Sequence, residues 1–176
     1  MSAKPVPSME GGDLAPPVQP VTPPYWDEAC KHLSKRDRVM RKLIADHGLA
    51  RLYSRGDAFT TLARSIVGQQ ISVKAAQSVW GKLLVLVGQD PEEARRPLGV
   101  EDLLSRTPEV LRTAGLSARK VDYLQDLARH FADGKVHVDQ WSDMPDAGII
   151  AALIDIRGIG RWTAELFPIF HLLRAT

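Results

Sequence analysis

The sequence predicts an all-α protein built as a compact array of several helices. From Tyr25 onward, apolar residues recur at the three- and four-residue spacing of helices that bury one face. Residues that cap helices precede several of these segments, and glycines follow them. No stretch combines alternating polarity with the tight turns of β-hairpins.

Each expected helix follows from its apolar spacing and its end signals. The side chains of four residues are placed to accept a backbone hydrogen bond at a helix start: Asp57, Ser72, Thr107 and Ser117. The expected helices span 25–33, 37–46, 59–67, 73–88, 101–104, 108–115, 118–134, 146–156 and 161–173. Residues 89–99 are expected to form a loop, and 136–138 are short enough to be extended.

The chain divides into a tail and one domain. Residues 1–24 hold seven of the twelve prolines and few large apolar side chains, which predicts a flexible tail. Residues 25–176 are long enough for one helical domain with a core. A net charge of +2 is compatible with a nucleic-acid partner but does not demonstrate one. The polar start and the lack of a long apolar run lead us to expect a monomeric, cytoplasmic, bacterial protein without a membrane association.

One segment predicts a grip on a nucleic-acid backbone. The apolar run from Ile150 reaches Gly158-Ile159-Gly160, and a second helix begins at once with Arg161 and Thr163. Glycines let the backbone turn tightly and approach another molecule, and the free N–H groups of a helix start suit a phosphate. This is the pattern of a helix-hairpin-helix. The alternative is a tight interhelical turn that uses glycine for geometry alone.

Two further features are candidates for contact with bases. The loop of Gln69, Gln70 and Ile71 interrupts two apolar helices and could enter a DNA groove. The residues by themselves favour the alternative, an ordinary helix connection. Trp162 follows the hairpin and could stack on a base, although it could also be a core residue. The five histidines show no metal-ligand spacing, and the single cysteine, Cys30, excludes a multi-cysteine zinc or iron–sulfur site within this chain.

Three motifs together resemble the helix-hairpin-helix (HhH-GPD) DNA glycosylase superfamily, and within it the 3-methyladenine DNA glycosylase II group. The motifs are Phe59-x-x-Leu62-x-x-x-Ile66-x-x-Gln69-Gln70-Ile71-Ser72-x-x-Ala75-Ala76, Gly115-Leu116-Ser117-x-x-Lys120, and Arg157-Gly158-Ile159-Gly160-Arg161-Trp162-Thr163-Ala164-Glu165.

The resemblance implies hydrolysis of the N-glycosidic bond of alkylated purines, such as 3-methyladenine, in double-stranded DNA, with the damaged base flipped out of the duplex. It implies a wedge loop at Gln69, Gln70 and Ile71 and a base pocket that includes Trp162. It also implies that the main chain binds phosphates, and that three turn carbonyls bind Na⁺ or K⁺. The residues expected to bind the DNA backbone are Gly158, Ile159, Gly160, Arg161 and Thr163. The carbonyls expected to bind the cation are those of Ile154, Arg157 and Ile159.

The resemblance also separates this chain from part of the superfamily. Strand-cleaving members carry a lysine where Trp162 stands, so this chain is similar to the monofunctional branch. Its single cysteine, Cys30, cannot hold the iron–sulfur cluster that several members of the superfamily contain. The family's catalytic aspartate is expected beyond Thr176, which indicates a C-terminally truncated, inactive or nearly inactive chain. The alternatives are a DNA-binding module without catalysis, and a protein-interaction domain in which the glycine turn is structural.

Overall fold

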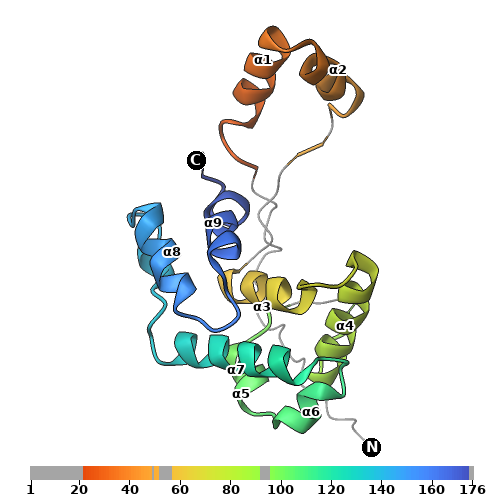
Figure 1. Cartoon of the computed structure of the whole chain (residues 1–176), viewed down its shortest axis with the longest axis vertical. Coiled ribbons are helices and arrows are strands. Elements are labelled where there is room, and N and C mark those ends of the chain that lie inside the picture. Colours follow the sequence, from red (N-terminus) through yellow and green to blue (C-terminus); the bar gives the residue numbers. More distant parts are fainter. Residues whose placement is uncertain (1–21, 49, 52–56, 92–95, 175–176) are drawn as a thin grey trace, which may run out of the picture.

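The computed structural model describes residues 22–48, 50–51, 57–91 and 96–174, and within these ranges it is entirely helical (Figure 1). Most of the expected proline-rich tail, residues 1–21, lies outside the described residues. The helices are α1 (Trp26–Arg36), α2 (Arg38–Asp46), α3 (Ala58–Gly68), α4 (Val73–Leu86), α5 (Val100–Leu104), α6 (Pro108–Arg112), α7 (Ala118–Ala132), the 3-10 helix η1 (Val138–Gln140), α8 (Asp146–Ile154) and α9 (Arg161–Phe170). The predicted all-α fold class is confirmed.

The expected N-caps are confirmed at all four positions. The side chains of Asp57, Ser72, Thr107 and Ser117 each accept a hydrogen bond from the backbone N–H three residues later. Each such bond satisfies one of the N–H groups that a helix start leaves without an intrahelical partner. The local sequence therefore fixes where α3, α4, α6 and α7 begin.

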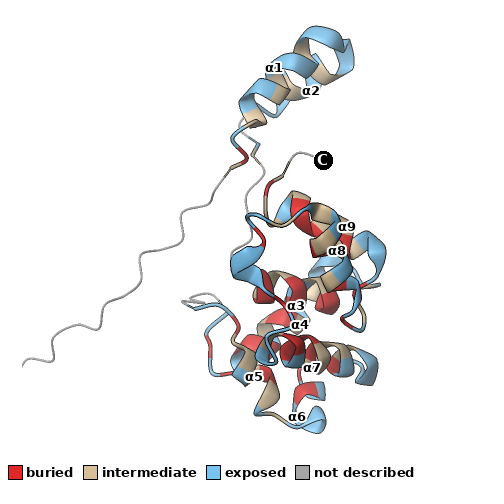
Figure 2. Cartoon of the chain, turned by 90° about the vertical axis from the view of Figure 1, so that its left-hand side faces the viewer, coloured by how far each residue is buried: buried red, intermediate tan, exposed pale blue. Residues whose placement is uncertain are grey.

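Helix α7 lies at the centre of the body and packs against α3, α5 and α6 (Figure 1). Its apolar stripe is buried, and the buried residues in Figure 2 gather on α3, α7 and the elements around them. Helices α8 and α9 pack against each other beside this body. The pair α1 and α2 lies apart from it, and neither of these two helices contains a buried residue.

Helices α8 and α9 end earlier than expected, and a proline lies inside α9. Helix α8 ends at Ile154, two residues early, because the following residues form the turn that leads into Gly158. Helix α9 ends at Phe170, three residues early, and Leu173 beyond it has a φ of +57°. Pro168 lies inside α9 and is buried, so the proline is accommodated without ending the helix at that point.

Residues 136–138 do not form a strand. Val138 instead begins a short 3-10 helix, η1, which leads into Trp141. The Trp141 side chain is almost fully buried and packs edge-on against the Phe167 ring, with centroids 5.1 Å apart. This contact joins the connection after α7 to α9. Among the described residues, no helix is long and apolar enough to cross a membrane.

Candidate nucleic-acid interface

The turn between α8 and α9 requires glycine at one position. Gly158 has a φ of +86°, in the left-handed region that L-residues avoid. A Cβ atom there would lie 2.2 Å from Cδ2 of Tyr123, which reaches the turn from α7. Both the backbone conformation and the lack of space exclude a side chain. The turn is closed by a 3.1 Å hydrogen bond from the N–H of Ile159 to the carbonyl of Ile156.

The second glycine marks an open helix start. Gly160 is the N-cap of α9, no side chain caps this end, and a Cβ on Gly160 would meet nothing within 4 Å. The first N–H groups of α9 therefore face free space at the positive end of the helix dipole, where an anion can reach them. The Arg161 guanidinium is exposed and forms a 2.7 Å ion pair with Glu165. The Ile159 side chain is buried, so only its main chain is available for the predicted contact.

The predicted wedge loop lies against this turn. The Gln69 side-chain amide donates a hydrogen bond to the Gly158 carbonyl, with Nε2 and O 2.7 Å apart. Gln70 is exposed and has a φ of +59°, a conformation that costs a residue other than glycine about 1–2 kcal/mol. Ile71 is 39% exposed and Ser72 begins α4. The structure therefore brings together two segments that are 89 residues apart in the sequence.

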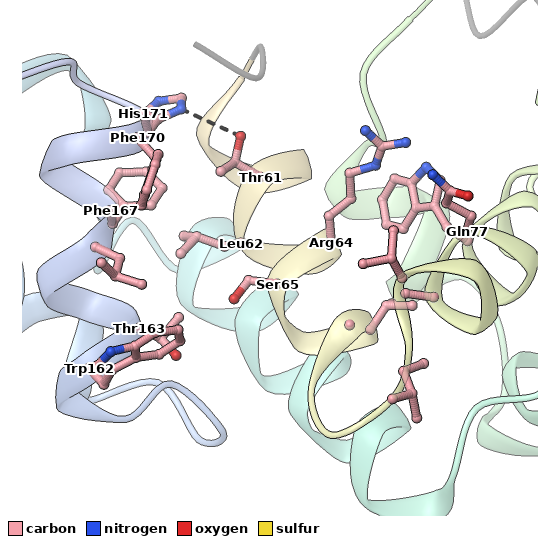
Figure 3. A pocket seen from close by; sticks show the side chains of 17 residues that line it. Thr61, Leu62, Arg64, Ser65, Gln77, Trp162, Thr163, Phe167, Phe170 and His171 are labelled. Atoms are coloured by element: carbon pink, nitrogen blue, oxygen red, sulfur yellow. Dashed lines mark hydrogen bonds between the residues drawn. The ribbon is translucent and has the colours of Figure 1, made fainter. Parts of the chain in front are cut away.

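A pocket of about 740 Å³ opens between α3, α4 and α9. Figure 3 shows Trp162, Thr163, Phe167, Phe170 and His171 along α9 and its end, facing α3. Trp162 is 74% exposed, which excludes the alternative of a core tryptophan.

The α3 wall of the pocket contains residues that the sequence analysis did not single out. Thr61, Leu62 and Ser65 lie opposite α9 in Figure 3. The Thr61 hydroxyl and His171 Nδ1 are 3.5 Å apart, which connects the two walls at one end. On the side of α3 toward α4, the Arg64 guanidinium lies 4.9 Å from the Trp80 ring centroid. Leu62 is a named residue of the first motif of the resemblance, whereas Thr61, Arg64 and Ser65 occupy its unspecified positions, and only their arrangement around a cavity identifies these three.

Two titratable groups near the interface have shifted pKa values. Burial lowers the pKa of His171 below that of a free histidine, and the negative charge of Asp57 partly opposes this effect. Burial raises the pKa of Asp126, but hydrogen bonds from Arg157 and the positive charge of Arg157 bring it below the ordinary value. The Asp126 carboxylate accepts from both the backbone N–H and the Nε of Arg157, each at 3.0 Å. His171 is thus held neutral, and Asp126 is held charged beneath the hairpin turn.

The residues described by the structure contain no group of three His, Cys, Asp or Glu side chains that could hold a metal ion. The pocket lining likewise includes no carboxylate among the described residues; its titratable side chains are Arg64 and His171. The interface therefore consists of an open helix start, a strained loop and an aromatic pocket, all adjacent.

Comparison with known proteins agrees with this architecture. Residues 63–166 match the model of the HhH-GPD superfamily of base excision DNA repair proteins, and the chain belongs to this family. The matched range contains the wedge loop, α7 and the hairpin turn.

Several relatives are 3-methyladenine DNA glycosylases. The chain is 29% identical over 149 residues to DNA-3-methyladenine glycosylase 1 of Schizosaccharomyces pombe, covering 81% of this chain and 62% of that protein. It is similar to the structure of DNA-3-methyladenine glycosidase from Bacillus halodurans, with 36% identity, a TM-score of 0.63, and coverage of 69% and 53% of the two chains. It is also similar to the S. pombe 3-methyladenine DNA glycosylase Mag1 in complex with abasic DNA, with 27% identity, a TM-score of 0.68, and coverage of 84% and 71%.

Three curated relatives match this chain over most of its length. The matched part of each relative is between about half and 62% of that relative's own length. What those proteins bind and cleave therefore comes to this chain as a proposal.

Proposed function

We propose that this chain belongs to a monofunctional DNA glycosylase that hydrolyses the N-glycosidic bond of alkylated purines in double-stranded DNA. The observation that carries the proposal is the adjacency of three features. The open start of α9 suits a phosphate, the strained Gln70 stands beside it, and the exposed Trp162 lines the pocket next to both. The relatives named 3-methyladenine DNA glycosylases support the choice of substrate.

In the proposed mechanism the main chain at the start of α9 holds the DNA backbone, and Gln70 or Ile71 fills the space left by the extruded base. The base stacks on Trp162, whose electron-rich face suits a positively charged alkylated purine. Water then adds to the sugar carbon and loses a proton to solvent, while the bond to the base nitrogen breaks and its electron pair leaves with the base; the product is an abasic site. Trp162 has no amine, so it cannot form a Schiff base with the sugar.

A monovalent cation at the hairpin is part of the proposal. Among the described residues, no backbone N–H donates to the carbonyls of Ile154, Arg157 or Ile159, whereas the neighbouring carbonyls of Leu153 and Ile156 are used in turn hydrogen bonds. Three carbonyls without a donor fit a Na⁺ or K⁺ ion, which would neutralise part of the nearby phosphate charge.

A second candidate function is a DNA-binding module that does not release bases. It is favoured by the pocket lining, in which no described residue supplies a carboxylate to stabilise a cationic sugar. On this observation we expect the 176-residue chain to bind DNA with little or no base release.

Two measurements on the same sample test these proposals. Binding to duplex DNA at low salt is followed by fluorescence anisotropy, and release of 3-methyladenine from methylated duplex is followed by chromatography. Binding with base release supports the glycosylase, and binding without release supports the module. No binding by a folded protein contradicts both proposals.

A further inference from the structure

Helix α7 presents three side chains in one row toward the two DNA-facing loops. Lys120, Tyr123 and Asp126 are spaced three residues apart, which places them on adjacent turns of one helix face. Lys120 contacts the backbone at the end of α3, just before the wedge loop, and Tyr123 and Asp126 contact the hairpin turn. The proposed function uses none of these three residues.

The first contact fixes the end of α3. The Lys120 ammonium donates a hydrogen bond to the Val67 carbonyl at 2.7 Å, and partial burial lowers the pKa of Lys120. The last carbonyls of a helix lack intrahelical donors, so this bond satisfies a group that α3 would leave open. Val67 lies two residues before Gln69, where the wedge loop begins.

The other two contacts fix the hairpin turn. The Tyr123 ring occupies the space that a side chain at Gly158 would need. The Asp126 carboxylate, whose side chain is only 13% exposed, holds the N–H and the guanidinium of Arg157. A largely buried carboxylate that accepts one backbone and one charge-assisted hydrogen bond restrains its partner strongly. Two consecutive residues of the turn, Arg157 and Gly158, therefore contact α7.

A direct bond completes the connection. Gln69 Nε2 donates to the Gly158 carbonyl at 2.7 Å, and Gln69 immediately precedes the strained Gln70. The wedge loop and the hairpin turn are thus joined to each other, and the same face of α7 holds the hairpin turn and the end of α3 that precedes the wedge loop. Neither loop can shift along α7 without breaking at least one of these contacts.

We infer that Gln69 is a positioning residue that fixes the distance between the wedge loop and the phosphate-binding turn. Lys120, Tyr123 and Asp126 support it from α7. Gln70 then enters the duplex at a set offset from the phosphates that α9 binds. This inference rests on the proposed function. It predicts that loss of the Gln69 bond reduces the affinity for DNA with a gap to fill more than the affinity for an intact duplex.

The test compares two glutamines that make the same kind of bond. Gln69→Met removes the donor to Gly158 and keeps the side-chain length; Gln125→Met removes a 3.2 Å bond from Gln125 Nε2 to the Arg106 carbonyl, away from both loops. Anisotropy gives the affinity of each variant for an intact duplex and for the same duplex with a tetrahydrofuran abasic site. The ratio of the two affinities is the preference.

We expect Gln69→Met to lower the preference about fivefold, the equilibrium effect of one net hydrogen bond. Gln125→Met should keep the wild-type preference. An unchanged preference in Gln69→Met, or an equal loss in both variants, overturns the inference.

Hydrogen exchange tests the connection without DNA. In Gln69→Met, amide exchange should become faster both in residues 68–72 and in residues 157–161, and in Gln125→Met in neither. Faster exchange in only one of the two segments overturns the inference. If the wild-type chain binds neither duplex, the proposed function fails, whereas the exchange result still decides whether Gln69 couples the loops.

Discussion

Substitution by alanine should have different effects at the two glycines of the hairpin: a loss of stability at Gly158 and a loss of DNA affinity at Gly160. Gly158→Ala places a methyl group 2.2 Å from the Tyr123 ring at a φ of +86°, so it meets both backbone strain and a clash. Left-handed strain costs about 1–2 kcal/mol and overpacking about 1–3 kcal/mol, which together lower the free energy of unfolding by about 2–5 kcal/mol. The expected fall in melting temperature is about 5–15 °C for a chain of this size. Gly134→Ala is the matched control, because Gly134 has a φ of +65° with nothing within 4 Å, so only the strain applies.

Gly160→Ala should instead leave the free energy of unfolding within about 0.5 kcal/mol of wild type. Its φ of −82° suits alanine and its Cβ meets no atom, so the loss of a favourable N-cap and the gain in chain stiffness nearly cancel. The added methyl stands where a phosphate would approach the N–H groups of α9, and affinity for duplex DNA should fall about tenfold or more. Urea unfolding and anisotropy at low salt measure the two quantities. Wild-type affinity in Gly160→Ala would refute the assignment of the backbone grip to this turn.

Three further substitutions test the charges and the pocket. Asp126→Asn should lower the free energy of unfolding at neutral pH. Because the folded-state pKa of Asp126 lies below its ordinary value, the difference in that free energy from wild type should shrink as the pH falls below about 4. Urea titrations at several pH values measure this difference. Because the pKa of His171 is lowered, the wild type should lose stability as the pH falls below about 6.5. His171→Asn should flatten that part of the plot of stability against pH. An equal slope in both proteins would contradict a neutral His171. Trp162→Ala should change stability by less than about 0.5 kcal/mol, since the ring is 74% exposed, and should lower affinity for duplex with a methylated purine about tenfold through lost stacking.

Local patterns predicted the helices and the residues of both loops. Each of the four N-caps bonds to a backbone N–H three residues away, and Gly158 adopts a conformation that glycine allows, so residue type and order suffice to place them. The contacts that join the loops have no such local signal. The Gln69 bond to Gly158 spans 89 residues and the Lys120 bond to Val67 spans 53. Nothing in the sequence indicates that Tyr123 occupies the space beside Gly158, since that depends on how α7 packs under the turn.

The strain at Gln70 argues for a role of its side chain. A glycine at a φ of +59° would avoid about 1–2 kcal/mol of strain. It would also raise the entropy cost of folding by about 0.5–1 kcal/mol. Gln70→Gly should therefore leave the free energy of unfolding unchanged or raise it by about 1 kcal/mol. Leu173, the other positive-φ position without glycine among the described residues, differs because its side chain is buried, and Leu173→Gly should destabilise. An exposed side chain held at a strained position gains nothing from packing, so its benefit has to come from a partner. Gln70→Gly should therefore lower the preference for abasic over intact duplex while urea unfolding shows no loss of stability. A variant that is less stable, or that keeps the full preference, would mean that Gln70 serves the fold and not the DNA.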